Sequence, residues 1–187
     1  VPRSAAQLPV YYNGKDHGYR GYVDQSAGPR HAFGHGLSYT TVVYGAPRLS
    51  RARVTADAPT LTCRVAVRNT GTRPAEETVQ LYVRRVSGGA SWPRVRELRG
   101  FVRLRIAPGA AADAVFEVDA ATLASVGRDL RLAVEPGVVE LETGPASDRT
   151  RTARLEISAP GREGDAEPDS ERVPEPTWEQ GSEPSGT

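Results

Sequence analysis

Apolar residues at every second position constrain the fold of this chain more than any other feature of its sequence. In residues 61–67, for example, Leu, Cys, Val and Val alternate with Thr, Arg and Ala. Alternate side chains of an extended strand point to opposite faces, so each such run predicts a strand with one buried face. With a weaker strand at residues 51–56, the pattern predicts seven or eight strands. The expected inward positions are Leu61, Cys63, Val65, Val67; Val79, Leu81, Val83; Val102, Leu104, Ile106; Ala114, Phe116, Val118; Leu130, Leu132, Val134; Val139, Leu141; and Ala153, Leu155, Ile157.

Turn-forming residues separate these runs. They are Asn69-Thr70-Gly71, Pro108-Gly109, Pro136-Gly137 and Gly144-Pro145. Short strands at roughly ten-residue spacing indicate an antiparallel β-sandwich of about 100 residues. A parallel α/β fold is disfavoured because no helical crossovers separate the strands. The one helical candidate is a turn at residues 119–126, with Asp119 as its N-cap and Gly127 at its end.

Two segments of different composition flank the predicted sandwich at residues 45–158. Residues 1–44 hold six of the seven tyrosines and all three histidines, broken by frequent glycines. We expect them to form an extended aromatic strap that lies on another surface. Residues 159–187 are rich in Glu, Pro, Ser and Gly, and cannot bury enough apolar surface to offset the entropy of ordering. We expect this acidic tail to be disordered.

The net charge of +1 conceals an uneven distribution. The tail holds eight acidic and two basic residues, a net of −6, which leaves +7 on the remainder. Arginines at 94, 96, 99, 103 and 105 suggest a nucleic-acid groove, but Arg103 and Arg105 alternate with apolar residues as the solvated face of a strand does. We therefore expect no nucleic-acid partner. No apolar stretch approaches the ~20 residues of a membrane span, and we expect no membrane partner.

Several motifs resemble one enzyme family. Residues 33–40 (FGHGLSYT) and 7–13 (QLPVYYN) come first, followed in order by residues 65–71 (VAVRNTG), 77–83 (ETVQLYV), 96–101 (RELRGF) and 134–137 (VEPG). Together they resemble the C-terminal region of glycoside hydrolase family three enzymes. The resemblance implies the end of that family's second α/β domain, followed by an immunoglobulin/fibronectin type III-like sandwich. The turn at Arg73-Pro74-Ala75-Glu76 departs from the family pattern, in which a glycine often precedes the glutamate.

The resemblance also implies what this chain lacks. The family's Asp nucleophile and Glu acid/base would lie upstream of Val1, and no residue here matches either motif. We therefore expect no catalytic residue, no cofactor and no activity of the chain alone. The missing initiator Met predicts a fragment of a longer β-glucosidase-like enzyme. Its partners would be the upstream catalytic barrel and α/β domains, which the sandwich would stabilise and position.

The alternative function is a freestanding β-sandwich module that binds a glycan or a protein. Trp92, Tyr11 and Tyr12 are the candidates for sugar binding. For contact between domains, the candidates are Tyr11, Tyr12, Phe33, Leu37 and Tyr39. The last three are also expected to anchor the strap to the sandwich.

A metal site is disfavoured. His31 and His35 have the spacing of a helical pair, with His17 nearby, but Pro29, Gly34 and Gly36 oppose a helix. The sequence does not fix the compartment. The cytoplasm is favoured over secretion because no signal peptide is visible.

Overall fold

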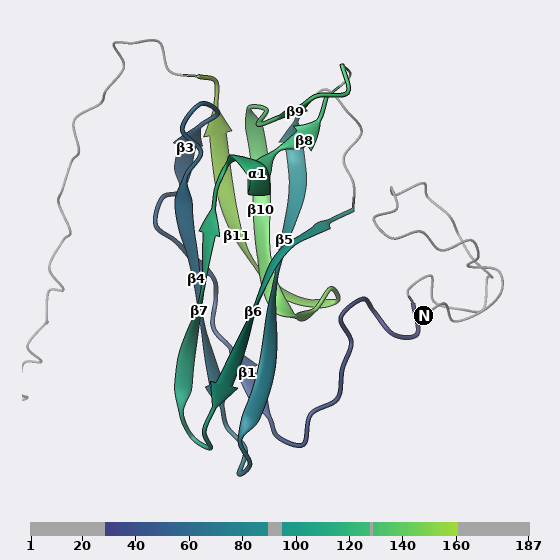
Figure 1. Cartoon of the computed structure of the whole chain (residues 1–187), viewed down its shortest axis with the longest axis vertical. Coiled ribbons are helices and arrows are strands. Elements are labelled where there is room, and N and C mark those ends of the chain that lie inside the picture. The colour runs from purple at the N-terminus through teal and green to yellow at the C-terminus, as the bar shows by residue number, and fades with distance from the viewer. Residues whose placement is uncertain (1–28, 90–94, 128, 161–187) are drawn as a thin grey trace, which may run out of the picture.

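This computed structural model describes residues 29–89, 95–127 and 129–160. Within those ranges the chain forms eleven strands and one short helix, with strands dominating (Figure 1). In chain order the elements are β1 (Val42–Tyr44), β2 (Arg48–Leu49), β3 (Arg53–Thr55), β4 (Leu61–Asn69), β5 (Ala75–Gly88), β6 (Glu97–Ile106), β7 (Ala111–Val118), α1 (Ala120–Leu123), β8 (Ser125–Val126), β9 (Leu132–Ala133), β10 (Gly137–Ala146) and β11 (Arg149–Ser158).

Nine of these strands build two sheets that face each other across a common core. The larger sheet has the order β3-β11-β10-β5-β6. In the smaller sheet, β4 pairs with β7 along most of its length, while β1 and β2 pair with opposite ends of β4. Because β7 occupies one edge of β4, β1 and β2 must share the other. All these pairings are antiparallel except that between β3 and β11. The architecture is the expected all-β sandwich.

The core consists of the residues that the alternation places inward. Cys63, Val65 and Val67 of β4 are fully buried, as are Val79 and Leu141 of the larger sheet. Phe116, Leu155 and Ile157 belong to the same cluster. Burial alone raises the pKa of the Cys63 thiol to about 11, so it packs as a small apolar side chain. The alternation therefore predicted most of the core correctly.

One of the predicted strands does not face the core. Leu130 and Leu132 are 84% and 70% exposed, and only Val134 packs partly against the core cluster. The reason is that β8 and β9 form a separate two-stranded sheet, and Leu130 lies in the left-handed region at φ 64°. The predicted inward orientation of these two leucines is wrong.

Other local differences follow from tertiary pairing. Gly144-Pro145 does not end a strand but forms an irregularity within β10. The helix has Asp119 as its N-cap, as predicted, because its side chain accepts a hydrogen bond from Thr122 N at 2.9 Å. The helix ends at Leu123 rather than at Gly127, since Ala124 is already extended and β8 begins at Ser125. The alternation missed β1, β2 and β8, which are only two or three residues long.

Residues 29–41 run outside the sandwich before β1 begins, within the segment assigned to the strap (Figure 1). Ala32 is buried, and the Phe33 carbonyl accepts a hydrogen bond of 2.9 Å from Ser147 N. At the other end, Thr41 O accepts 2.8 Å from Thr70 N, beside Asn69 of β4. Both ends of this run are thus tied to the sandwich through backbone hydrogen bonds.

Candidate functional site

The candidate residues on the strap are turned outward. Leu37 and Tyr39 are 95% and 94% exposed, and Phe33 is half exposed. The expectation that the side chains of Leu37 and Tyr39 anchor the strap to the sandwich is wrong. The strap is held instead by small residues and backbone groups, namely Ala32, Gly34 and the Phe33 carbonyl. Trp92, Tyr11 and Tyr12 lie outside the described residues.

A polar layer lies under the strap, on the face of the larger sheet opposite the core. Gln80 and Tyr82 of β5 are buried there although their neighbours Val79 and Leu81 fill the core. The Tyr82 hydroxyl donates to Gln80 Oε1, and Gln80 Nε2 donates to Pro145 O at 2.6 Å. Gly34 covers Gln80 so closely that an added Cβ would lie 2.4 Å from Gln80 Nε2. Gly34 has φ +79°, which further favours glycine.

Glu142 is the buried charge of this layer. Arg96 Nη1 lies 3.0 Å from Glu142 Oε2, outside hydrogen-bonding geometry, and Arg84 Nε lies 3.5 Å from Oε1. Arg96 also donates to the Ser147 carbonyl, next to the strap's own hydrogen bond. Burial raises the pKa of Glu142, and the two guanidinium groups offset part of that rise. The arrangement joins the sheet to the 145–147 segment that holds the strap.

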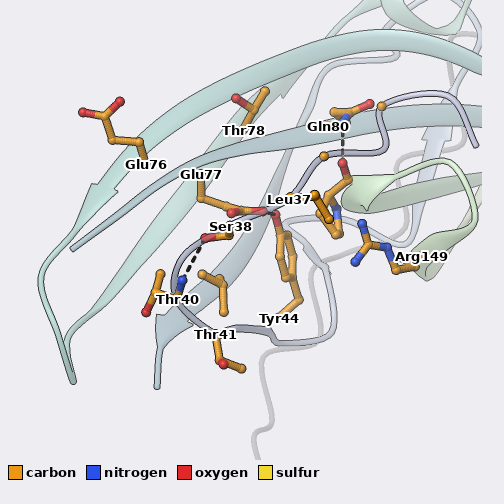
Figure 2. A pocket seen from close by; sticks show the side chains of 14 residues that line it. Leu37, Ser38, Thr40, Thr41, Tyr44, Glu76, Glu77, Thr78, Gln80 and Arg149 are labelled. Carbon is orange, nitrogen blue, oxygen red and sulfur yellow. Dashed lines mark hydrogen bonds between the residues drawn. The ribbon is translucent and has the colours of Figure 1, made fainter. Parts of the chain in front are cut away.

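A cleft of about 480 Å³ opens between the strap and the N-terminal half of β5. Figure 2 shows Tyr44, Glu77 and Arg149 converging on it, with Ser38 and Thr40 supplied by the strap. The Tyr44 hydroxyl donates to Glu77 Oε1 at 2.7 Å. Burial, followed by the hydrogen bond and the negative charge of Glu77, raises the pKa of Tyr44. The phenol therefore stays protonated and fixes the position of the carboxylate.

The sequence did not single out Tyr44, Glu77 or Arg149. One available signal was on β5, where Gln80 and Tyr82 occupy positions that a solvent-facing strand fills with charged residues. Uncharged polar residues there indicate a second covered face. The cleft itself depends on the path of the strap, which alternation does not encode.

The described residues form neither the metal site nor the nucleic-acid groove that the sequence analysis considered. The rings of His31 and His35 lie 4.8 Å apart, and no group of three His, Cys, Asp or Glu in these ranges could hold a metal ion. Arg103 and Arg105 are exposed, each 3.7–3.9 Å from Glu76. Arg96 and Arg99 turn inward instead, to Glu142 and to the Ala124 carbonyl. The described arginines of this run therefore do not form one basic groove.

No described helix is long and apolar enough to cross a membrane.

Comparison with known proteins identifies the type of domain. The family model of the fibronectin type III-like domain matches residues 77–147, within the sandwich. The chain is 32% identical over 167 residues to the periplasmic β-glucosidase of Salmonella typhimurium, covering 83% of this chain and 22% of the relative. It is 35% identical over 165 residues to a β-xylosidase of Formosa agariphila, again covering 83% and 22%.

A solved structure agrees with these relatives. The β-glucosidase of Erythrobacter marinus superposes with a TM-score of 0.75 at 37% identity, over 81% of this chain and 20% of that one. The chain therefore matches the fibronectin type III-like segment of β-glucosidase-like glycoside hydrolases, which confirms the resemblance seen in its motifs. It spans about a fifth of the length of these relatives, in which the matching segment is one part of a larger enzyme.

Proposed function

We propose that this chain is the non-catalytic C-terminal segment of a β-glucosidase-like glycoside hydrolase, and that it stabilises and positions the catalytic domains. The hydrolysis of O-glycosyl bonds would belong to an upstream barrel and α/β domain. The relatives named β-glucosidase and β-xylosidase support this, because the chain matches only about a fifth of each. The observation that carries the proposal is the outward display of Leu37 and Tyr39.

The strap holds these two side chains in place. Backbone hydrogen bonds at Phe33 and Thr41 fix the run on either side, and the Thr40 hydroxyl donates to Asn69 Oδ1 at 2.8 Å. Because the backbone is already fixed, a partner that covers these side chains restricts only their rotamers. Each would contribute roughly 1.5–3 kcal/mol on full burial. The strap therefore suits docking of the domain that precedes it.

The proposal assigns a part to each segment. Residues 1–44 would be the strap and the remnant of the α/β domain, residues 45–158 the fibronectin type III-like domain, and residues 159–187 the acidic tail. Tyr11, Tyr12, Phe33, Leu37 and Tyr39 would form the interdomain contact. No catalytic group would come from this chain, so hydrolysis of a nitrophenyl glycoside by the purified chain would contradict the proposal.

The direct test replaces both exposed residues in the full-length parent enzyme. A Leu37→Ser, Tyr39→Ser variant should show a lower melting temperature and a lower soluble yield, because the interface loses apolar area. The same pair of changes in the 187-residue chain alone should leave its stability unchanged. Leu130→Ser, which alters an exposed leucine away from the strap, is the matched control. Equal melting temperatures for the parent and its double variant would contradict the docking role.

The alternative, a freestanding module that binds a glycan or a protein through Trp92 and the tyrosines of the strap, predicts a different result. A glycan pull-down with the 187-residue chain would then retain the protein, and Trp92→Ala would abolish that retention. Retention that Trp92→Ala does not change would rule out this binding mode.

A further inference from the structure

The cleft beside the strap lies against an open edge of β5. Strand β10 pairs with β5 only as far as Gly144, which lies opposite Gln80, whereas β5 begins at Ala75 and pairs with β6 from there. Residues 76–78 therefore have a sheet neighbour on one side only. In the part of the chain that the structure describes, no backbone hydrogen bond joins them to the strap. Backbone donors and acceptors are thus available along this wall of the cleft.

The side chains of the cleft select against a charged ligand. Glu77 can only accept hydrogen bonds and Arg149 can only donate them. An anion would meet the Glu77 carboxylate, and a cation would meet the Arg149 guanidinium. Arg149 keeps donors available, since its ion pair to Asp148 within the described residues spans 4.0 Å and its side chain is half exposed. The chemistry favours a neutral ligand that both donates and accepts.

The other residues that line the cleft also favour a neutral, hydrogen-bonding ligand. Ser38, Thr40 and Thr41 supply hydroxyl groups that donate or accept. Tyr44 and Val42 add apolar surface, and the hydrogen bond to Glu77 holds the Tyr44 ring in place (Figure 2). A sugar ring presents hydroxyl groups at its edge and C–H groups on its faces. It therefore matches a cleft that combines hydroxyls, the carboxylates of Glu76 and Glu77, one base and an aromatic ring.

We propose that this cleft binds a neutral polyhydroxylated ligand, a mono- or disaccharide unit of a glycan, with Arg149 and Glu77 holding its hydroxyl groups. The volume of about 480 Å³ lies within the range of small-molecule sites. The proposal does not depend on docking to upstream domains, because every group in it belongs to this chain. The residues it names are other than Trp92, Tyr11 and Tyr12, the candidates expected from the sequence.

The test titrates the 187-residue chain, labelled with nitrogen-15, with glucose, xylose, cellobiose and xylobiose while amide NMR spectra are recorded. Sorbitol serves as an open-chain polyol control. We expect saturable shifts at the amides of residues 38–41, 76–78 and 149 with at least one sugar, at a dissociation constant on the order of 1 mM. Sorbitol should produce no saturable shift.

Variants then assign the binding to the cleft. Arg149→Ala should weaken the affinity about tenfold, as loss of a charged hydrogen-bond donor does. Glu77→Gln should weaken it too, while keeping an acceptor for Tyr44. Arg154→Ala is the control, since Arg154 is exposed on the same strand and does not line the cleft. Spectra of each variant report whether the sandwich stays folded.

Two outcomes would overturn the proposal. One is the absence of saturable shifts with all four sugars. The other is binding that Arg149→Ala and Glu77→Gln leave unchanged in folded protein, because the sugar would then lie elsewhere on the chain.

Discussion

The two faces of strand β5 are both buried, but by different chemistry. On one face Val79, Leu81 and Val83 enter the apolar core between the sheets. On the other, Gln80 and Tyr82 lie in a polar layer beneath the strap. Apolar side chains pack wherever their volume fits, because the hydrophobic effect is non-directional. A buried amide or hydroxyl instead requires a partner at hydrogen-bonding distance. The core therefore stabilises the sandwich as a whole, while the polar layer fixes where the strap lies.

The largest effect should come from the apolar face. Leu141→Ala removes a side chain with no exposed surface from the core cluster, and should lower the free energy of unfolding by about 2–5 kcal/mol. Urea denaturation of the 187-residue chain measures this change. Leu37→Ala is the matched control, because Leu37 is almost fully exposed, and should cost less than ~0.5 kcal/mol. Comparable losses in the two variants would contradict the position assigned to the core.

The polar face should respond less strongly. Gln80→Ala removes one hydrogen bond to the Pro145 carbonyl and one from the Tyr82 hydroxyl. We expect a loss of about 1–3 kcal/mol in the free energy of unfolding. Thr78→Ala, two residues earlier on the same face, is the control and should be nearly neutral. If Gln80→Ala proves as harmless as Thr78→Ala, the polar layer does not contribute to stability.

The contrast between the faces also explains what the sequence could predict. Strand alternation depends only on the neighbours along the chain, so it identified Val65, Val79 and Leu141 as core residues. It could not show that the strap covers Gln80, because that depends on Gly34, which is far away in sequence. For the same reason it could not identify Glu77 as a partner of Tyr44.

Leu130 and Leu132 show the opposite failure. Their alternation with Arg131 is the same as that of core strands, yet both are exposed. After α1 the chain forms the small β8–β9 sheet instead of returning directly to the larger one. A period of two identifies a face of a strand, but not what covers that face.

The strap gives the next prediction. Gly34→Ala should lower the free energy of unfolding by about 1–2 kcal/mol, because φ +79° is strained for alanine and the new Cβ would press on Gln80. Gly36→Ala is the matched control, since Gly36 has open space around its Cβ and no positive φ. Hydrogen exchange at the Ser147 amide, which donates to Phe33 O, reports the strap directly. Equal exchange rates at this amide in the two variants would contradict the role of Gly34.

The smallest effect concerns the buried charge under the strap. Burial raises the pKa of Glu142 above its ordinary value of 4.5, although Arg96, Arg84 and a hydrogen bond with Thr150 oppose the rise. A carboxyl with a raised pKa in the folded state favours folding in its neutral form. This contribution is complete below pH 4.5 and is lost as the pH rises through the folded pKa.

Glu142→Gln keeps the shape and remains neutral at every pH, so it isolates this contribution. Between pH ~4 and ~8, the free energy of unfolding of the unmodified chain should fall relative to that of the variant. The fall should be ~1.4 kcal/mol for each unit by which the folded pKa exceeds the unfolded one. Urea denaturation at a series of pH values measures the difference. The opposite result would be a free energy of unfolding that rises with pH in the unmodified chain relative to the variant. It would mean that attraction to Arg96 and Arg84 outweighs the burial of Glu142, so that the ion pair stabilises the fold.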